Sequence, residues 1–482
     1  MTAAQRPLPR GVVARYAIGS IGTGGFATLP GLVLVYYLTD TLGVAALAAG
    51  AVVTAAKVWD VVIDPWIGDR SDRALARHGT RRTRMVVGAV TLPVFFALTF
   101  AVPPGIGPVA SGVWVALAFL ATATSFSLFQ VPYIGLPAEL TPGYDARTRL
   151  LTWRVVVLTI AILLFGAGGP EVREAFDDEH VGYLVMAIVA GVAIGLGMLV
   201  ATTVAPRRAA AKQEADVSDV LDAPPAPDAS PATPAPEVAA DPGGGIRGAY
   251  RDGIAVLRRS RAFRVLLSVF VLQGLATGLM LAGAQFVATW VLHDRGAVTY
   301  LFVALIAPAV LCAPIWGVIA RHIGKERGFG WASAIFAVAA LALVGLAFAP
   351  GPWVYAPVAL AGAAYAGMQS LPMAMLPDVI SHDARVHGDE RAGSFSGVWT
   401  AGETAGMALG ATVLSIVLAL TGYVESVAGQ AVEQGPAAVL GIVLAFSVIP
   451  AALVAASLVG IRRYPLRRAD IEPVSAVEGA VR

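Results

Sequence analysis

Long apolar runs separated by short polar loops make up most of the chain. Crossing about 30 Å of hydrocarbon takes roughly 20 helical residues, and twelve of the runs are long enough. The pattern therefore predicts an all-helical membrane protein with twelve transmembrane helices, at roughly 13–38, 44–68, 84–103, 110–137, 150–169, 181–205, 263–292, 297–320, 329–349, 352–377, 393–421 and 436–461.

A polar stretch divides the twelve runs into two sets of six. It is rich in Pro, Ala and Asp and lacks apolar periodicity, so we expect a largely disordered cytoplasmic linker, with a regulatory docking segment as the alternative. Residues 254–263 are compatible with a short amphipathic helix at the membrane surface. The expected organisation is an N-terminal six-helix half (1–205), the linker (206–262), a C-terminal six-helix half (263–462) and a cytoplasmic tail (463–482).

Composition supports the membrane class and excludes several functions. The chain is 57% hydrophobic, only 14% of its residues are charged, and its mean hydropathy is +0.72. Soluble chains carry roughly 25% charged residues. The net charge of +2 indicates neither nucleic acid nor an acidic partner. Cys312 is the only cysteine, which excludes an intrachain disulfide, and the absence of a Gly-Lys-Ser phosphate loop argues against drive by ATP.

Basic residues orient the predicted helices. Short loops rich in Lys and Arg stay in the cytoplasm, and with the N-terminus inside, the loops that hold Arg70 to Arg84 and Arg321 to Arg327 fall on that side. An even number of spans returns the C-terminal Arg462 to Arg468 to the same side. We therefore expect a multi-pass protein of the plasma membrane, or of the inner membrane in a bacterium with two membranes, with both termini cytoplasmic.

Three charged residues lie in the second apolar run. Lys57, Asp60 and Asp64 are three and four residues apart, so a helix presents all three on one face. Each charge inside a membrane costs about 2.5–3.5 kcal/mol on insertion scales. One interpretation is that Lys57 neutralises one acid while Asp64 reaches interfacial water. The other is that the two carboxylates hold Na⁺ or H⁺, between which the sequence does not choose.

Other polar groups lie within predicted spans. In the fourth, Ser127 fits ordinary helix packing, whereas Gln130 needs partners from another helix, water or a substrate. Glu403 in the eleventh is a candidate functional group or half of an ion pair between helices.

Charged loops on the cytoplasmic side are candidate gating contacts. The loop after residue 377 also contains histidines and aspartates, but their spacing fits no zinc pattern, so no metal beyond a coupling cation is expected. The candidate gating residues are Asp69, Arg70, Asp72, Arg73, Arg81, Arg82, Glu139, Arg149 and Asp378.

The two halves resemble each other. DPWIGDRSDR, from Asp64 to Arg73, recurs in weaker form as APIWGVIARHIGKER from Ala313. Repeated halves are typical of transporters. Ala309 and Ala313 stand where Asp60 and Asp64 stand, so the repeated hairpin forms without either acid, and the acids belong to a task of the first half.

Three segments carry a resemblance to a known family. AKVWDVVIDPWIGDRSDR, VPYIGLPAEL with the following RTRLLTWR, and MLPDVISHDARVHGDERAGSFSGVW resemble the glycoside–pentoside–hexuronide:cation symporters of the major facilitator superfamily, the group of the melibiose permease. The resemblance spans both halves and implies the major facilitator fold. It also implies that Asp60 and Asp64 bind the coupling cation and that the hydroxyl of Ser127 completes the site.

The substrate side of the resemblance is weaker. Gly24 and Gln130 stand where the melibiose permease has sugar-binding aspartates, Ile134 stands at a tryptophan, and Thr404, beside Glu403, stands at a lysine. Lys57 and Arg154 stand where the family also has basic residues. The substrate-binding residues expected on this basis are Lys57, Gly24, Gln130, Ile134, Arg154, Glu403 and Thr404.

The expected function is secondary active transport, a cation-coupled symport of a sugar-like or glycoside-like small molecule by alternating access. The protein would be no enzyme, would need no cofactor besides its coupling ion, Na⁺ or H⁺, and would work as a monomer in the lipid bilayer without nucleic acid. Two alternatives stay open. One is a proton-coupled exporter or a lysolipid or amphiphile transporter of the same fold, and the other is a membrane sensor or scaffold.

Overall fold

The computed structural model describes residues 8–140, 144–205, 246–387, 392–430 and 432–466. The first half is built from seven described helices, of which α1 and α2 form one span bent at Gly19. Their bounds are α1 Arg10–Ile18, α2 Ser20–Tyr36 with a π-helical turn Tyr37–Thr41, α3 Ala46–His78, α4 Arg82–Phe100, α5 Pro108–Leu140, α6 Tyr144–Glu174 and α7 Glu179–Thr202.

The second half repeats this plan after a helix within the expected linker. The linker helix, α9, packs against α14 and α10 and begins eight residues before the amphipathic segment predicted at residue 254. The bounds are α9 Ile246–Arg259, α10 Arg261–Phe286 with a π-helical turn Val287–Val291, α11 Ala297–Ile323, α12 Lys325–Ala342, α13 Tyr355–His387, α14 Ala392–Leu420, α15 Pro436–Phe446 and α16 Val448–Arg462.

The described helices confirm the predicted all-helical membrane class. Eleven segments among the described residues are long and apolar enough to cross a membrane. The helix α13 is the twelfth long segment. Its Gly, Pro, Gln, Ser and Tyr positions lower its hydropathy, yet it packs along α11 and α12 as a span would. With α1 joined to α2 and α15 joined to α16, each half therefore contains six spans.

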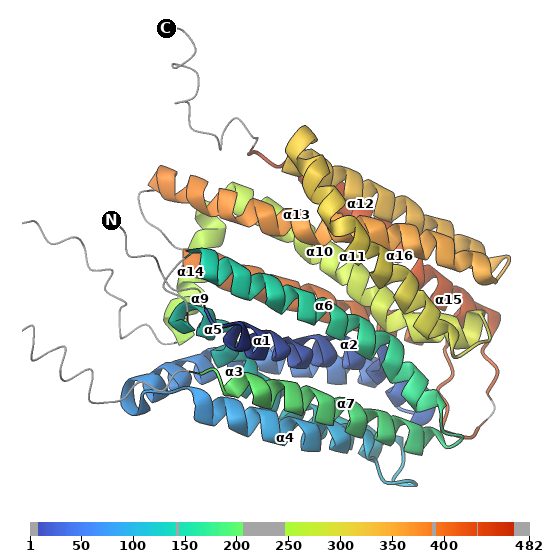
Figure 1. The fold of residues 1–482 in the computed structure, drawn as a ribbon. Coiled ribbons are helices and arrows are strands. Elements are labelled where there is room, and N and C mark those ends of the chain that lie inside the picture. Colours follow the sequence, from blue (N-terminus) through green and yellow to red (C-terminus); the bar gives the residue numbers. More distant parts are fainter. Residues whose placement is uncertain (1–7, 141–143, 206–245, 388–391, 431, 467–482) are drawn as a thin grey trace, which may run out of the picture.

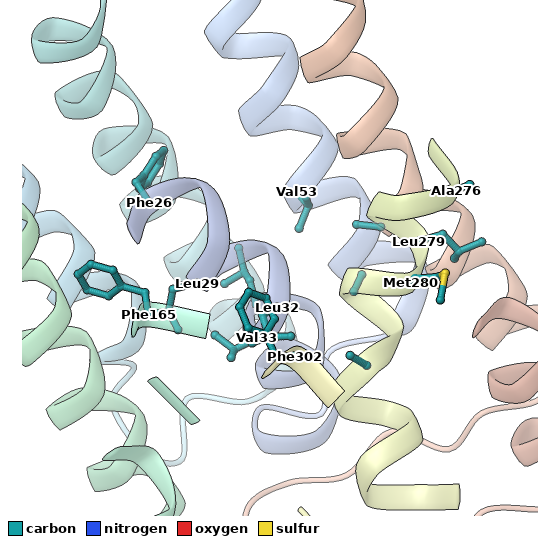
Figure 2. Packing of buried hydrophobic residues seen from close by; sticks show 14 of the residues in the cluster. Phe26, Leu29, Leu32, Val33, Val53, Phe165, Ala276, Leu279, Met280 and Phe302 are labelled. Atoms are coloured by element: carbon teal, nitrogen blue, oxygen red, sulfur yellow. The ribbon is translucent and has the colours of Figure 1, made fainter. Parts of the chain in front are cut away.

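The two halves lie side by side, with the first half, blue to green, mostly below the second half, yellow to red (Figure 1). Three pairs of helices join them: α3 packs against α14, α6 against α11, and α2 against α10. An apolar core fills this interface, where Leu32 and Val33 of α2 lie near Phe302 of α11 (Figure 2). The joint between the halves is therefore part of the hydrophobic core.

Small residues let these helices approach closely. A Cβ added to Gly166 of α6 would lie 2.1 Å from the ring of Phe302 on α11, so only glycine fits there without a shift. Gly50 of α3 likewise faces Ser415 of α14, where an added Cβ would lie 2.6 Å away. Such close contacts are typical of helix pairs in membranes.

Candidate functional site

Asp60 and Asp64, which we call the acid pair, lie on α3 and are only partly neutralised. Lys57 Nζ lies 3.2 Å from Asp60 Oδ2, and the two side chains are 31% and 12% exposed. Asp60 Oδ1 and Asp64 Oδ1 are buried and have no hydrogen-bond partner. One ammonium group thus serves one oxygen of one acid, and two buried carboxylate oxygens are left without a donor, which is costly inside a membrane.

Local sequence explains the geometry. The helix α3 runs unbroken through Pro65, so Asp60 and Asp64 stack one turn apart. The repeated hairpin on α11 has Ala309 and Ala313 at the corresponding positions, as expected from the sequence.

A hydroxyl from α5 completes the cluster. Ser127 is buried beside the carboxyl group of Asp64, as the resemblance implied. Carboxylate and hydroxyl oxygens are the ligands that hard cations prefer, and a proton would satisfy the same oxygens. No group of three or more His, Cys, Asp or Glu residues gathers elsewhere in the described residues to hold a metal ion.

Residues of α2 and α5 line the same region. Lys57 Nζ lies 5.9 Å from the ring centre of Phe26, which stacks on Phe126 at 4.4 Å. One turn before Phe26, Thr23 Oγ1 donates a hydrogen bond of 2.9 Å to Gln130 Oε1. Gln130 of α5, a predicted substrate residue, therefore contacts the same face of α2 that Lys57 contacts.

Arg154 of α6 brings a second positive charge to this half. Its guanidinium carbon lies 5.5 Å from the ring centre of Tyr133, and its Nε is buried without a hydrogen-bond partner. The hydroxyl of Tyr133 donates to the carbonyl oxygen of Tyr16 at 2.8 Å, which fixes the ring. One N–H of Arg154 is therefore available for an anionic or carbonyl oxygen.

The other predicted substrate residues are scattered. Gly24 is buried against α6, and a Cβ there would lie 2.9 Å from the carbonyl oxygen of Leu158. This glycine therefore permits close helix packing at the position where the melibiose permease has a sugar-binding aspartate. Ile134 is 51% exposed on α5. Thr404 is half-buried on α14, and Glu403 lines a small cavity inside the second half. The seven residues thus do not form one cluster in this conformation.

Three of the predicted gating residues, Arg70, Arg81 and Asp378, make contacts within their own half. The guanidinium carbon of Arg70 lies 4.0 Å from the ring centre of Trp66, and Arg81 Nη1 donates to Ser71 Oγ at 3.2 Å. Asp378 pairs with Lys325 at 2.6 Å. Arg73 and Arg149 are exposed and Arg82 is half-buried, while the side chains of Asp69, Asp72 and Glu139 lie outside the described residues. Their role as a latch between the halves stays a prediction.

The sequence did not predict the contacts that join the halves at the end opposite to the predicted gating residues. The buried Asp40, at the end of the first span, accepts hydrogen bonds at Oδ1 from Trp290 Nε1 at 3.1 Å and from the hydroxyl of Tyr423 at 2.5 Å. Thr39 Oγ1 donates to its Oδ2 at 2.6 Å. Burial, followed by the Asp40 carboxylate, raises the pKa of Tyr423 well above its usual value, so its hydroxyl remains a donor.

Backbone and ion-pair contacts reinforce this junction, which we call the closed end. The backbone N–H groups of Ser426 and Ala428 donate to the carbonyl oxygens of Thr39 and Thr41, each at 3.0 Å. Arg295 pairs with Glu179 at 2.5 Å, again across the halves. An acid directly after the first apolar run was the signal that could have identified Asp40, although its partners lie in the distant second half.

In the part of the chain that the structure describes, twelve spans in two repeated halves form the architecture of a multi-pass membrane transporter of the major facilitator type. A family model described as MFS/sugar transport protein matches residues 15–220 and 236–468. The chain belongs to this family.

Curated relatives and solved structures are similar along nearly the whole chain. The "Uncharacterized symporter sll1374" of Synechocystis is 23% identical over 94% of each chain, and the "Glucuronide carrier protein homolog" of Escherichia coli is 22% identical over 94% of this chain and 92% of the relative. The crystal structure of a D-xylose–proton symporter matches with a TM-score of 0.63 at 11% identity, covering 95% of this chain and 98% of that one.

Proposed function

We propose that the protein imports a sugar-like or glycoside-like small molecule by symport with Na⁺ or H⁺. The observation that carries this proposal is the acid pair on α3, in which Lys57 neutralises one oxygen of Asp60 and leaves Asp60 Oδ1 and Asp64 Oδ1 without partners. A cation bound by these oxygens and by Ser127 would remove the excess negative charge. Family membership and the similarity to a glucuronide carrier homologue support the class of substrate.

Lys57, Gln130 and Arg154 are the residues that we propose to face the substrate. Gln130 offers an amide, and Arg154 offers a buried N–H without a partner. Two cationic groups in one half suit a substrate with a carboxylate, such as a hexuronide. Gly24, Ile134 and Thr404 would contribute shape more than polar contacts.

Cation transport and substrate transport are coupled if both ligands prefer the same conformation of the protein. If cation and substrate each bind the same arrangement of the halves more tightly, each raises the affinity for the other by the same factor. Lys57 offers a physical link, because an anionic substrate that draws Lys57 away from Asp60 would free that carboxylate for the cation. We place both termini in the cytoplasm, an orientation in which the closed end would face outward.

Uptake into proteoliposomes tests the proposal. Labelled glycosides, pentoses, hexuronides and lysolipids would be offered with an inward Na⁺ gradient, an inward H⁺ gradient, or neither. We expect uptake of a sugar-like substrate that depends on one gradient and loses this dependence in Asp60→Asn and Asp64→Asn. Asp177→Asn, an exposed acid in the loop between α6 and α7, is the matched control and should behave as the wild type.

Other outcomes would favour the alternatives. Uptake that ignores both gradients and both substitutions would make Asp60 a structural partner of Lys57 and remove the coupling proposal. Efflux driven by an inward proton gradient would instead indicate an exporter. Deletion of residues 210–245 should leave transport intact, whereas a sensor that acts through its linker would lose its function.

A further inference from the structure

A small, partly open cavity lies in the second half, between α10, α13 and α14. Its volume is about 10 Å³, and its polar lining comes from Gln273, Thr277, Tyr365, Gln369 and Glu403. A space of this size holds about one water molecule. The cavity is separate from the acid pair, which lies on α3 of the first half.

Hydrogen bonds around the cavity leave one strong acceptor without a donor. Gln273 is 3% exposed, and its Nε2 donates to Ser333 Oγ at 2.9 Å and to Ser457 Oγ at 3.0 Å, which uses both N–H groups. Its Oε1 is buried and has no partner. The serine bonds fix which way the amide points, so the unpartnered oxygen belongs to the carbonyl side.

The hydrogen bonds observed on the α13 side of the cavity go to groups other than Gln273 Oε1. Gln369 Nε2 donates to the hydroxyl oxygen of Tyr365 at 2.5 Å, which leaves the Tyr365 O–H to find its own acceptor near Glu403. Thr277 Oγ1 donates to the backbone carbonyl of Gln273 at 3.0 Å. None of these contacts supplies a hydrogen for Gln273 Oε1.

No positive charge compensates Glu403 among the residues lining the cavity. Tyr365 is the other titratable group there, and none of the lining residues is basic. Thr412, which hydrogen-bonds Thr54 of α3, lies nine residues after Glu403, about two and a half helical turns, so Glu403 points away from α3 and from its Lys57 and acid pair.

Among the described side chains, those of α9, α2 and α15 that pack against α14 provide no charged partner for Glu403. The linker helix α9 meets α14 at Val398, where its Arg251 and Arg258 are exposed and its Arg259 pairs with Asp383 of α13. Near α14, α2 adds only Tyr36 as a titratable group, and α15 adds none.

We propose that Glu403 is a proton-binding site in which the carboxylic acid donates its hydrogen to Gln273 Oε1, directly or through the single water molecule that the cavity can hold. The acid form supplies the hydrogen that Gln273 lacks, and its other oxygen accepts from Tyr365. Protonation also removes a lone charge from the membrane interior, where it costs about 2.5–3.5 kcal/mol. The second half thereby contains a cation site of its own, independent of the acid pair and of the identity of the substrate.

Infrared difference spectroscopy of the full-length protein in lipid nanodiscs tests this site without a substrate. Spectra at acidic and alkaline pH should show a carbonyl band of a protonated carboxylic acid that disappears on alkalinisation. We expect the part of this band that belongs to Glu403 to be absent in Glu403→Gln and to remain when both Asp60 and Asp64 are changed to Asn. If Glu403→Gln removes no part of the carbonyl band, or if no band can be assigned to Glu403 at any pH, the proposal is wrong.

Two further variants separate proton binding from a structural role. Gln273→Met removes the acceptor and should move the midpoint of the Glu403 band to lower pH, because the acid form loses its hydrogen-bond partner. Ser333→Ala breaks a bond on the other side of Gln273, keeps Oε1, and should leave the midpoint unchanged. Equal midpoints in Gln273→Met and the wild type contradict the geometry. Loss of the band when NaCl replaces choline chloride would make Na⁺ the occupant instead of the proton.

Discussion

Removing the hydroxyl of Tyr423 should open the closed end. Tyr423→Phe keeps the ring packed against Phe286 at 5.6 Å but deletes the donor to the buried Asp40 carboxylate. A hydrogen bond to a charged group contributes about 1.5–3 kcal/mol. Trp290 Nε1 still donates to the same oxygen, so we take the lower figure. Each 1.4 kcal/mol is tenfold, and the open population should rise about tenfold.

A reporter cysteine between the halves measures this population. Leu281 of α10 packs across the interface, with its side chain 3.1 Å from the position of a Cβ on Gly31 of α2. It is half-buried here, and we expect it to become more exposed when the end opens. Leu281→Cys in a Cys312→Ala background would react with a maleimide in proportion to the open fraction, in nanodiscs where both faces are accessible. The labelling rate should rise about tenfold in Tyr423→Phe.

The matched control is Tyr300→Phe. Tyr300 lies on α11, is exposed, and makes its ring contact with Tyr355 of the same half, so its hydroxyl plays no part in joining the halves. Its labelling rate should equal that of the parent. If Tyr423→Phe also labels at the parent rate, or if both variants accelerate alike, the Asp40 contacts do not hold the end closed and the reasoning is wrong.

Three further predictions follow from the geometry. Gly166→Ala places a Cβ against the Phe302 ring, so labelling at the closed end should accelerate, and adding Phe302→Ala should reverse the effect. Lys57→Gln removes the group that competes with the cation for Asp60. Because partly exposed ion pairs contribute about 1 kcal/mol, the affinity for the cation should rise about fivefold. The affinity is measured as the cation-dependent shift in Tm, and a shift equal to that of the wild type would contradict the competition. Gln130→Leu leaves Thr23 without its acceptor and should raise KM for the substrate with the gradient dependence kept, whereas an unchanged KM would remove Gln130 from the substrate site.

The sequence predicted what depends on local pattern. Apolar run lengths predicted six spans in each half, and the spacing of Lys57, Asp60 and Asp64 predicted that they share one face of α3, because helical periodicity determines both. The contacts of Asp40 escaped prediction because Trp290 and Tyr423 lie in the second half, and no periodicity relates positions so far apart. Which neighbours surround a side chain in the folded protein depends on the packing of whole helices.

Gly24 and Glu403 illustrate the same limit. Alignment to a family motif placed both at substrate positions, yet Gly24 permits close packing with α6 and Glu403 faces a cavity between α10 and α13. The direction of a side chain from its helix, and the helix that it meets, decides its role. That direction follows from tertiary packing, which a motif does not specify.

The helix that carries the acid pair also forms the central contact between the halves. Thr54 of α3 hydrogen-bonds Thr412 of α14, and Gly50 one turn earlier packs against Ser415. Asp64 and Lys57 lie within about 80° of these contacts around the helix, on the same side of α3, so a rocking motion about this contact changes what faces Asp64. A bound cation can therefore bias the motion directly through α3, with no longer chain of contacts required.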